Sequence, residues 1–111
     1  MSQPQLERLS DIATDAHTLV QQNHLEINPV VGISRSMRAS GFAADAMTID
    51  CLKTSRRIIL ILHDDEPSII RYQFAFRDKD PSDTFEVIEF ELLTVEKLYD
   101  WIVSYFTKNT N

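Results

Sequence analysis

The chain is poor in the residues from which many catalytic and cofactor sites are built. Its 111 residues include one cysteine and two glycines. A lone cysteine forms neither an internal disulfide nor a cysteine-based zinc site. Two glycines cannot supply a glycine-rich phosphate or dinucleotide cradle. The motifs of α/β-hydrolases, zinc proteases and zinc deaminases are also missing. We therefore expect no cofactor and no metal, and we favour a non-enzymatic role.

Long apolar runs and an excess of positive charge are lacking as well. The apolar run at 58–62 is far too short for a membrane helix, which needs ~20 residues. The first ten residues do not show the pattern of a secretory signal. The formal net charge is −6, which disfavours binding to a phosphate backbone. We expect a cytoplasmic protein whose partners include neither membrane nor nucleic acid.

What the chain does have is the composition of a globular domain. Hydrophobic residues make up 43% and charged residues 25% of the sequence. A chain of this length is expected to form one domain, residues 1–111, with one modest core. The only cysteine, Cys51, falls inside an expected strand and is interpreted as a small core residue.

Alternating and β-branched segments predict four strands, at about 45–52, 57–63, 69–77 and 85–93. Consecutive strands joined by polar turns favour an antiparallel meander. A turn at 64–67 would set Ile61 opposite Ile70 and Ile59 opposite Tyr72. This register gives one strongly apolar face and a second, mixed face. The second face is expected to carry the apolar residues Ile58, Leu60, Leu62, Ile69, Ala75 and Val87 and the polar residues Arg71, Gln73, Glu89 and Glu91.

Helical periodicity flanks the strands. Apolar residues at steps of three and four predict a helix over about 4–23, and a second over about 95–108 with Thr94 as its N-cap. The segment 24–44 is expected to be irregular. It could hold a short helix ended by Gly41, an extended loop, or a short strand at 25–27. The fold class is therefore α+β, with two layers; a helix on each face of the sheet is the alternative.

The half-apolar second face indicates a binding surface. Exposed apolar patches usually mark interaction sites, and bulky aromatics at the margin of a helix stripe are common in interfaces. The candidate interface residues are Ile58, Leu60, Leu62 and Ile69 on the sheet, and Trp101 and Tyr105 on the last helix. The leading hypothesis is an interaction domain that binds another protein or forms a homodimer.

The alternative hypothesis is a small-ligand-binding domain or enzyme. Arg35 and Arg38 lie three residues apart among serines, and paired guanidinium groups can bind a phosphate or carboxylate. The acidic segment 63–66 is interpreted as a solvated turn and not as a metal site, because neighbouring turn side chains rarely converge on one ion.

The face assignment also predicts the cost of two neighbouring truncations. Phe74→Ala should cost about 3–5 kcal/mol as a core truncation. Gln73→Ala should cost well under about 1 kcal/mol if Gln73 lies on the more exposed face.

Overall fold

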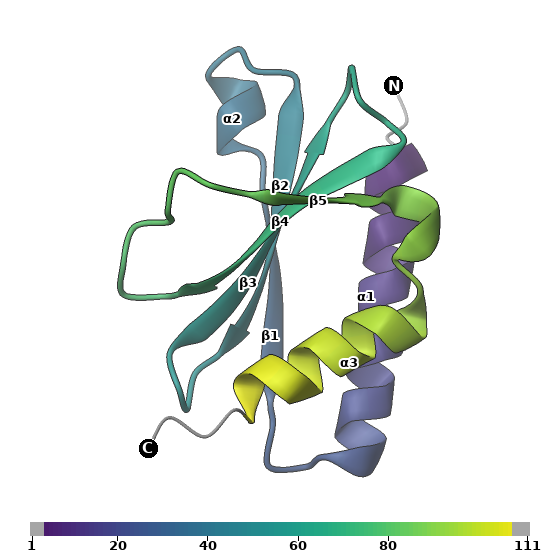
Figure 1. The fold of residues 1–111 in the computed structure, drawn as a ribbon, viewed down its shortest axis with the longest axis vertical. Coiled ribbons are helices and arrows are strands. Elements are labelled where there is room, and N and C mark those ends of the chain that lie inside the picture. The colour runs from purple at the N-terminus through teal and green to yellow at the C-terminus, as the bar shows by residue number, and fades with distance from the viewer. Residues whose placement is uncertain (1–3, 108–111) are drawn as a thin grey trace.

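The computed structural model describes residues 4–107, which form an α+β fold with a five-stranded antiparallel sheet and a helix at each end of the chain (Figure 1). The strands follow one another in the order β1-β2-β3-β4-β5. The elements are α1 (Pro4–Asn23), β1 (Pro29–Ser34), α2 (Ser36–Ala39), β2 (Ala44–Cys51), β3 (Arg56–His63), β4 (Ile69–Phe76), β5 (Glu86–Glu89), the 3-10 turn η1 (Phe90–Leu92) and α3 (Val95–Phe106). Lys108, the last residue of the expected second helix, lies outside the described residues.

The sheet has one strand more than the four expected. The additional strand, β1, falls in the segment that was expected to be irregular, and it pairs with β2 from Pro29 to Ser34. Pro29 and Gly32 argue against a central strand, but an edge strand tolerates Pro at its first position. The last strand is shorter than expected. It stops at Glu89, and the chain turns through η1 before Thr94 caps α3 by accepting from the Lys97 backbone N–H.

The register between β3 and β4 differs from the expected one by a single residue. Leu60 pairs with Tyr72 and Ile58 with Phe74, because residues 64–68 connect the strands and the turn is one residue longer than expected. A one-residue shift moves every side chain of a strand to the opposite face. The assignment of Ile58, Leu60 and Leu62 to the second face is therefore wrong.

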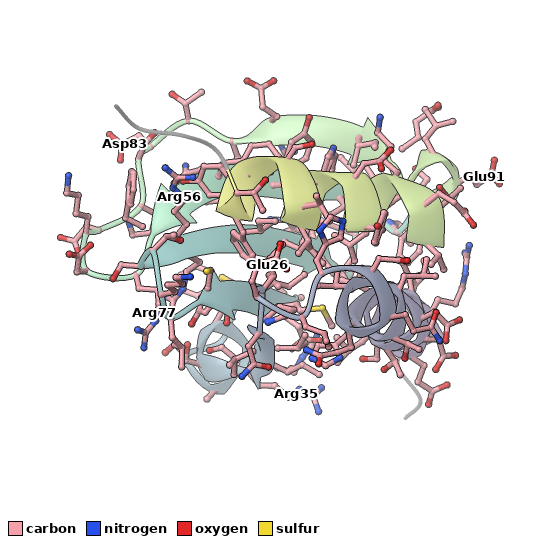
Figure 2. The ribbon with its side chains drawn as sticks, turned by 90° about the horizontal axis from the view of Figure 1, so that it is seen from below. Glu26, Arg35, Arg56, Arg77, Asp83 and Glu91 are labelled. Carbon is pink, nitrogen blue, oxygen red and sulfur yellow. The ribbon has the colours of Figure 1, made fainter. Side chains whose placement is uncertain are left out.

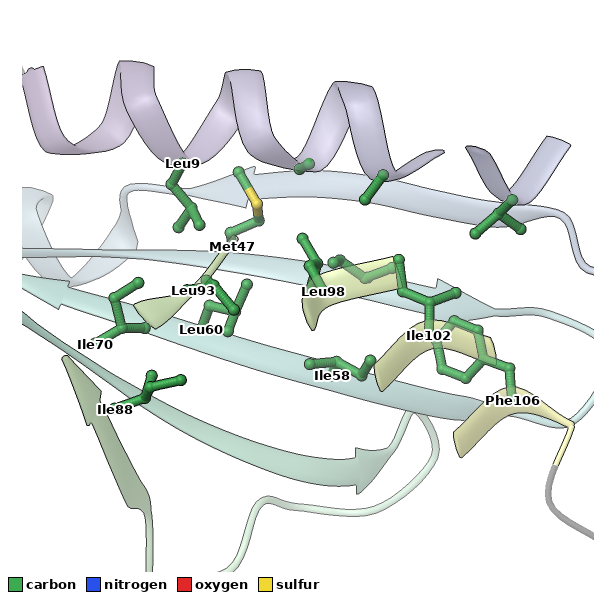
Figure 3. Packing of buried hydrophobic residues seen from close by; sticks show 14 of the residues in the cluster. Leu9, Met47, Ile58, Leu60, Ile70, Ile88, Leu93, Leu98, Ile102 and Phe106 are labelled. Atoms are coloured by element: carbon green, nitrogen blue, oxygen red, sulfur yellow. The ribbon is translucent and has the colours of Figure 1, made fainter. Parts of the chain in front are cut away.

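Both helices pack on the same face of the sheet, so the alternative of one helix on each face is also wrong (Figure 1). The core lies between them and the sheet (Figure 3). Most of its buried side chains come from α1 (Leu9, Ala13, Ala16, Val20), from the strands (Met47, Ile49, Cys51, Ile58, Leu60, Leu62, Ile70, Ile88) and from α3 (Leu98, Ile102, Phe106), and the connecting segments add Ile27, Phe90 and Leu93. Fully burying a large aliphatic or aromatic side chain of this kind stabilises the fold by about 1.5–3 kcal/mol.

A buried arginine fixes the C-terminal end of α3. The Arg56 side chain is 4% exposed, donates to the backbone carbonyl of Tyr105, and lies 5.4 Å from the centre of the Tyr105 ring (Figure 2). The Tyr105 hydroxyl in turn donates to the Ala75 carbonyl at 2.7 Å. A cation at a helix C-terminus interacts favourably with the helix dipole, so these contacts anchor α3 to β3 and β4.

The loop between β4 and β5 folds over the sheet face opposite the helices, which we call the open face (Figure 1). Gln73 holds this loop. Its Nε2 donates to the carbonyls of Ser82 (3.0 Å) and Thr84 (2.8 Å), and its Oε1 accepts from the Ser82 N–H at 3.0 Å. Gln73 is consequently 9% exposed while Phe74 is 41% exposed. The expected exposure of these two side chains is reversed.

Candidate interaction surface

The three apolar residues expected on the binding face of β3 belong to the core. Ile58 and Leu60 are fully buried and Leu62 is 7% exposed, all beneath the two helices. In this structure a partner cannot reach them without displacing a helix. Ile69 does lie on the open face, where it is half-buried at the start of β4.

The aromatic residues of α3 attach that helix to β4. The Trp101 ring stacks on Tyr72 with a centroid distance of 4.4 Å and meets Phe74 edge-on at 5.6 Å. Tyr105 lies 5.1 Å from Phe74. Such pairs contribute about 0.5–1.5 kcal/mol beyond area burial. Trp101 and Tyr105 remain half-buried, and their inner faces are committed to β4.

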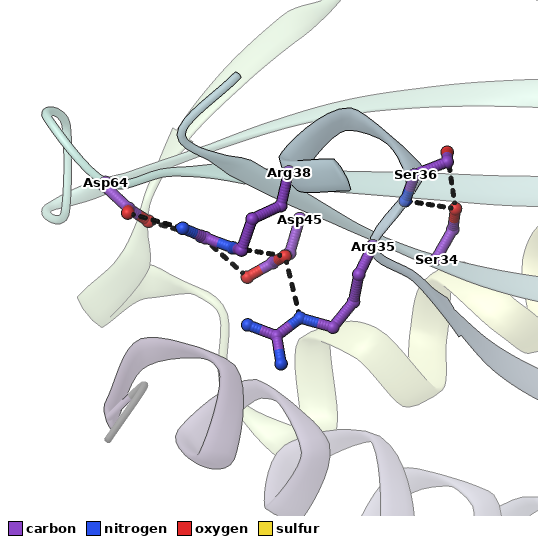
Figure 4. A network of polar contacts seen from close by, with 6 residues as sticks. All are labelled: Ser34, Arg35, Ser36, Arg38, Asp45 and Asp64. Atoms are coloured by element: carbon purple, nitrogen blue, oxygen red, sulfur yellow. Dashed lines mark hydrogen bonds and ion pairs between the residues drawn. The ribbon is translucent and has the colours of Figure 1, made fainter. Parts of the chain in front are cut away.

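Arg35 and Arg38 do converge, but on carboxylates of their own chain (Figure 4). Arg38 donates to Asp45 through Nε and Nη2, both at 3.0 Å, and to Asp64 at 2.8 and 2.9 Å. Arg35 donates to Asp45 at 3.2 Å. The hydrogen bond from Arg38 is the main cause that lowers the pKa of Asp45 below its ordinary value, and that of Arg35 adds to it. An anion approaching Arg38 would have to displace these carboxylates.

The arginine cluster joins segments that are distant in sequence. Asp45 is 1% exposed at the start of β2, while Asp64 belongs to the turn after β3. Arg38, from α2, bridges the two. A buried carboxylate is tolerated when it is paired and hydrogen-bonded, as Asp45 is. This arrangement clamps the β1–β2 connection onto the sheet.

The open face is not a bare apolar patch. Ile59 lies at its centre, 7% exposed, and ion pairs border it. Arg57 binds Asp50 through two hydrogen bonds of 2.7 and 3.0 Å, and Arg77 adds a third at 3.3 Å. Further along the sheet, Arg71 pairs with Glu66 at 2.9 Å. The exposed large apolar side chains of the open face lie instead at the two edges of the sheet, Val30 on β1 and Val87 on β5.

The two sheet edges differ in charge. β5 carries Glu86 and Glu89 in four residues and then bends into η1. β1, with the sequence PVVGIS, has no charged residue, and its large apolar side chains are solvent-exposed: Val30 45%, Val31 38% and Ile33 49%. Sequence reasoning missed this strand. The signal that could have revealed it is the set of β-branched residues on either side of Gly32, namely Val30, Val31 and Ile33.

The concave site beside the arginine cluster contains an internal ion pair. A surface hollow of about 500 Å³ is lined by Met37, Phe42, Ala43, Ala44, His63, Asp64 and Asp65. Asp64 is already held there by Arg38. Within residues 4–107, no group of three or more His, Cys, Asp or Glu side chains is placed to hold a metal ion. Cys51 is buried in the core.

No protein-family model matches the chain, and comparison with curated proteins and with solved structures finds no significant similarity. No helix within the described residues is both long enough and apolar enough to cross a membrane.

Proposed function

We propose that this chain is a non-enzymatic protein-binding domain whose binding surface is the exposed edge strand β1. The observation that carries the proposal is that this edge combines exposed apolar side chains with a complete absence of charge. Unpaired backbone N–H and C=O groups of an edge strand are a template for a strand from another chain.

The contrast with β5 supports this choice of surface. Folded proteins commonly blunt their sheet edges with charged side chains, bends or very short strands. β5 has all three features, since it spans Glu86–Glu89, carries two carboxylates and ends in η1. β1 has none of these three features over its six residues, and its one edge-protecting residue, Pro29, is confined to the first position. An edge left open in this way is typical of a strand that acquires a partner.

The surface proposed here differs from the one expected from the sequence. Ile58, Leu60 and Leu62 are unavailable because they lie under the helices, and Trp101 and Tyr105 pack on β4. The general role, binding another protein or a second copy, is unchanged. No contact favours the ligand-binding alternative, since Arg35 and Arg38 are both paired with Asp45.

The test is capture of partners from an extract of the source cells by the immobilised chain. The wild type, an Ile33→Lys variant and a Val87→Lys variant would be compared by quantitative mass spectrometry. Ile33 and Val87 are both 49% exposed on edge strands, so the two lysines perturb the fold to a similar extent. A bound protein, or the chain itself, should be lost with Ile33→Lys alone. If both variants capture what the wild type captures, β1 is not the binding surface.

A further inference from the structure

We infer that β1 pairs antiparallel with β1 of a second copy of this chain, about a twofold axis at Gly32, so that two five-stranded sheets join into one. This inference rests on the proposed function, because it names the partner of the edge proposed there. The evidence is the self-complementarity of the strand, the distribution of charge around it and the signs of charge at its two ends.

The strand is self-complementary about Gly32. In an antiparallel pair with twofold symmetry, each residue faces the one equally far from the centre on the other strand. Val31 then lies opposite the partner's Ile33, and Ile33 opposite the partner's Val31. Both face the helix side of the sheet, because they pair with Ile49 and Met47 of β2. Val30 lies opposite the partner's Ser34 on the open face. Two apolar cross-strand pairs thus form from side chains that are exposed in the single chain.

The charge distribution allows a second copy to approach at this edge. Each chain carries a formal net charge of −6, so most orientations of two copies are repulsive. No Asp, Glu, Lys or Arg occurs between Ile27 and Ser34. The side of α1 next to Asn28 and Pro29 also carries no Asp, Glu, Lys or Arg. His17 donates to the Pro29 carbonyl at 3.0 Å and Gln21 to Asn28 at 3.3 Å, which places this side of the helix beside β1.

Helical spacing extends the uncharged stripe along α1. Ser10 and Thr14 lie on the same side as His17 and Gln21, at steps of three and four residues. The acidic residues Asp11 and Asp15 lie on other sides of the helix and are exposed, whereas Glu7, three residues before Ser10, lies at the N-terminal end of the same stripe. Two copies joined through β1 therefore also bring toward each other, on the same face of the joined sheet, the part of this stripe from Ser10 to Gln21, which carries no Asp, Glu, Lys or Arg.

The ends of β1 carry opposite charges. Arg35 follows the strand with its side chain 50% exposed, and Glu26 precedes it with its side chain 59% exposed (Figure 2). In the antiparallel pair, the end of one strand that carries Arg35 meets the end of the other that leads back to Glu26. Opposite charges therefore approach each other at both ends of the interface. A parallel arrangement would bring like charges together, so the charges favour the antiparallel pairing.

The first experiment is the molar mass of the purified full chain in solution, by light scattering or sedimentation equilibrium, over about 1–100 µM. We expect twice the monomer mass of 12.8 kDa at the upper concentrations. Ile33→Lys should give the monomer throughout, whereas Val87→Lys should keep the dimer. Far-UV circular dichroism checks that both variants are folded. A wild type that stays monomeric, or a dimer that survives Ile33→Lys, overturns the inference.

The second experiment tests the register. With Cys51→Ala removing the native thiol, Gly32→Cys should form a disulfide between copies under mild oxidation, because directly opposed Cα atoms lie within disulfide range. A β-carbon at Gly32 meets only Thr48 Oγ1, at 3.4 Å, so the substitution fits the strand. Ser34→Cys in the same background should crosslink poorly, because its mate is the partner's Val30. Equal crosslinking of the two variants contradicts an axis at Gly32.

The two proposals can fail separately. A monomeric chain that still captures another protein through β1 overturns the second-copy inference and leaves the proposed function standing. A monomeric chain whose captured proteins are indifferent to Ile33→Lys overturns both.

Discussion

The loop between β4 and β5 depends on one side chain, and removing it gives the sharpest test of the fold. Gln73→Ala deletes three hydrogen bonds, two from Nε2 to loop carbonyls and one from the Ser82 N–H to Oε1. Each such bond contributes a net ~0.5–1.5 kcal/mol. The loop groups that lose their partner can reach water, which reduces the loss. We therefore expect a cost of about 2 kcal/mol, not the value below about 1 kcal/mol predicted from the sequence.

The assay is urea unfolding followed by far-UV circular dichroism and by the fluorescence of Trp101, the only tryptophan. In a separate thermal melt, a two-state domain of this size should lose roughly 8 °C in its melting temperature for a loss of about 2 kcal/mol. Gln73→Glu keeps the size of the side chain but loses both donors, so it should cost at least as much. Amide hydrogen exchange should accelerate at Ser82 and leave β2 and β3 unaffected.

Phe74→Ala is the matched comparison. Phe74 is 41% exposed, so its truncation should cost about 1–2.5 kcal/mol, mainly through lost contacts with Trp101 and Tyr105. This is below the 3–5 kcal/mol expected for a core position. If Gln73→Ala is harmless while Phe74→Ala costs more than about 3 kcal/mol, the arrangement of β4 described here is wrong.

Three further changes test other parts of the structure. Ser55 adopts a φ of 59°, so Ser55→Gly should relieve strain and raise the free energy of unfolding by about 0.5–1 kcal/mol in thermal melts. Arg56→Met should lower the free energy of unfolding by about 2–3 kcal/mol, because the Tyr105 carbonyl loses a buried donor. The same substitution should cost less in a chain that lacks the C-terminal turn of α3, which would show that Arg56 and this turn are energetically coupled. Asp45→Asn should destabilise by about 2 kcal/mol at pH 7. Because pairing with Arg38 lowers the pKa of Asp45 in the folded state, this stabilisation is present above the ordinary value of 3.8 and is lost as the pH falls through the lower folded value. The difference from the wild type in urea unfolding should therefore shrink at pH 3, and a constant difference would contradict the ion pair.

The fold class could be predicted from the sequence, but the faces of β3 could not. The run 58–62 is apolar at both odd and even positions, so alternation does not say which set faces the core. The choice then depends on the length of the turn, and one residue more or less reverses it. In β4 the alternation of Ile70, Tyr72 and Phe74 with Arg71 and Gln73 is clear, and these residues do lie on the faces expected from it.

The clamp at Asp45 was beyond sequence reasoning for a different reason. Arg35 and Arg38 are recognisable as a pair, but their partners lie 7 to 26 residues away and belong to other elements. Which carboxylates they meet depends on how the β1–β2 connection returns to the sheet. That path depends on β1, a strand that is hard to predict from the sequence because Pro29 and Gly32 interrupt its apolar residues.

The different protection of the two edges bears on how large an assembly could grow. A chain with two open edges would add copies at both, and sheets would extend without limit. Here β5 carries Glu86 and Glu89 and bends into η1, so the proposed pairing is confined to β1. Pairing of β1 with itself about a twofold axis uses the same surface on both copies and closes at two. The two edges therefore have complementary effects on assembly. The open edge at β1 would join two copies, and the charged, bent edge at β5 would prevent the further growth that a second open edge would permit.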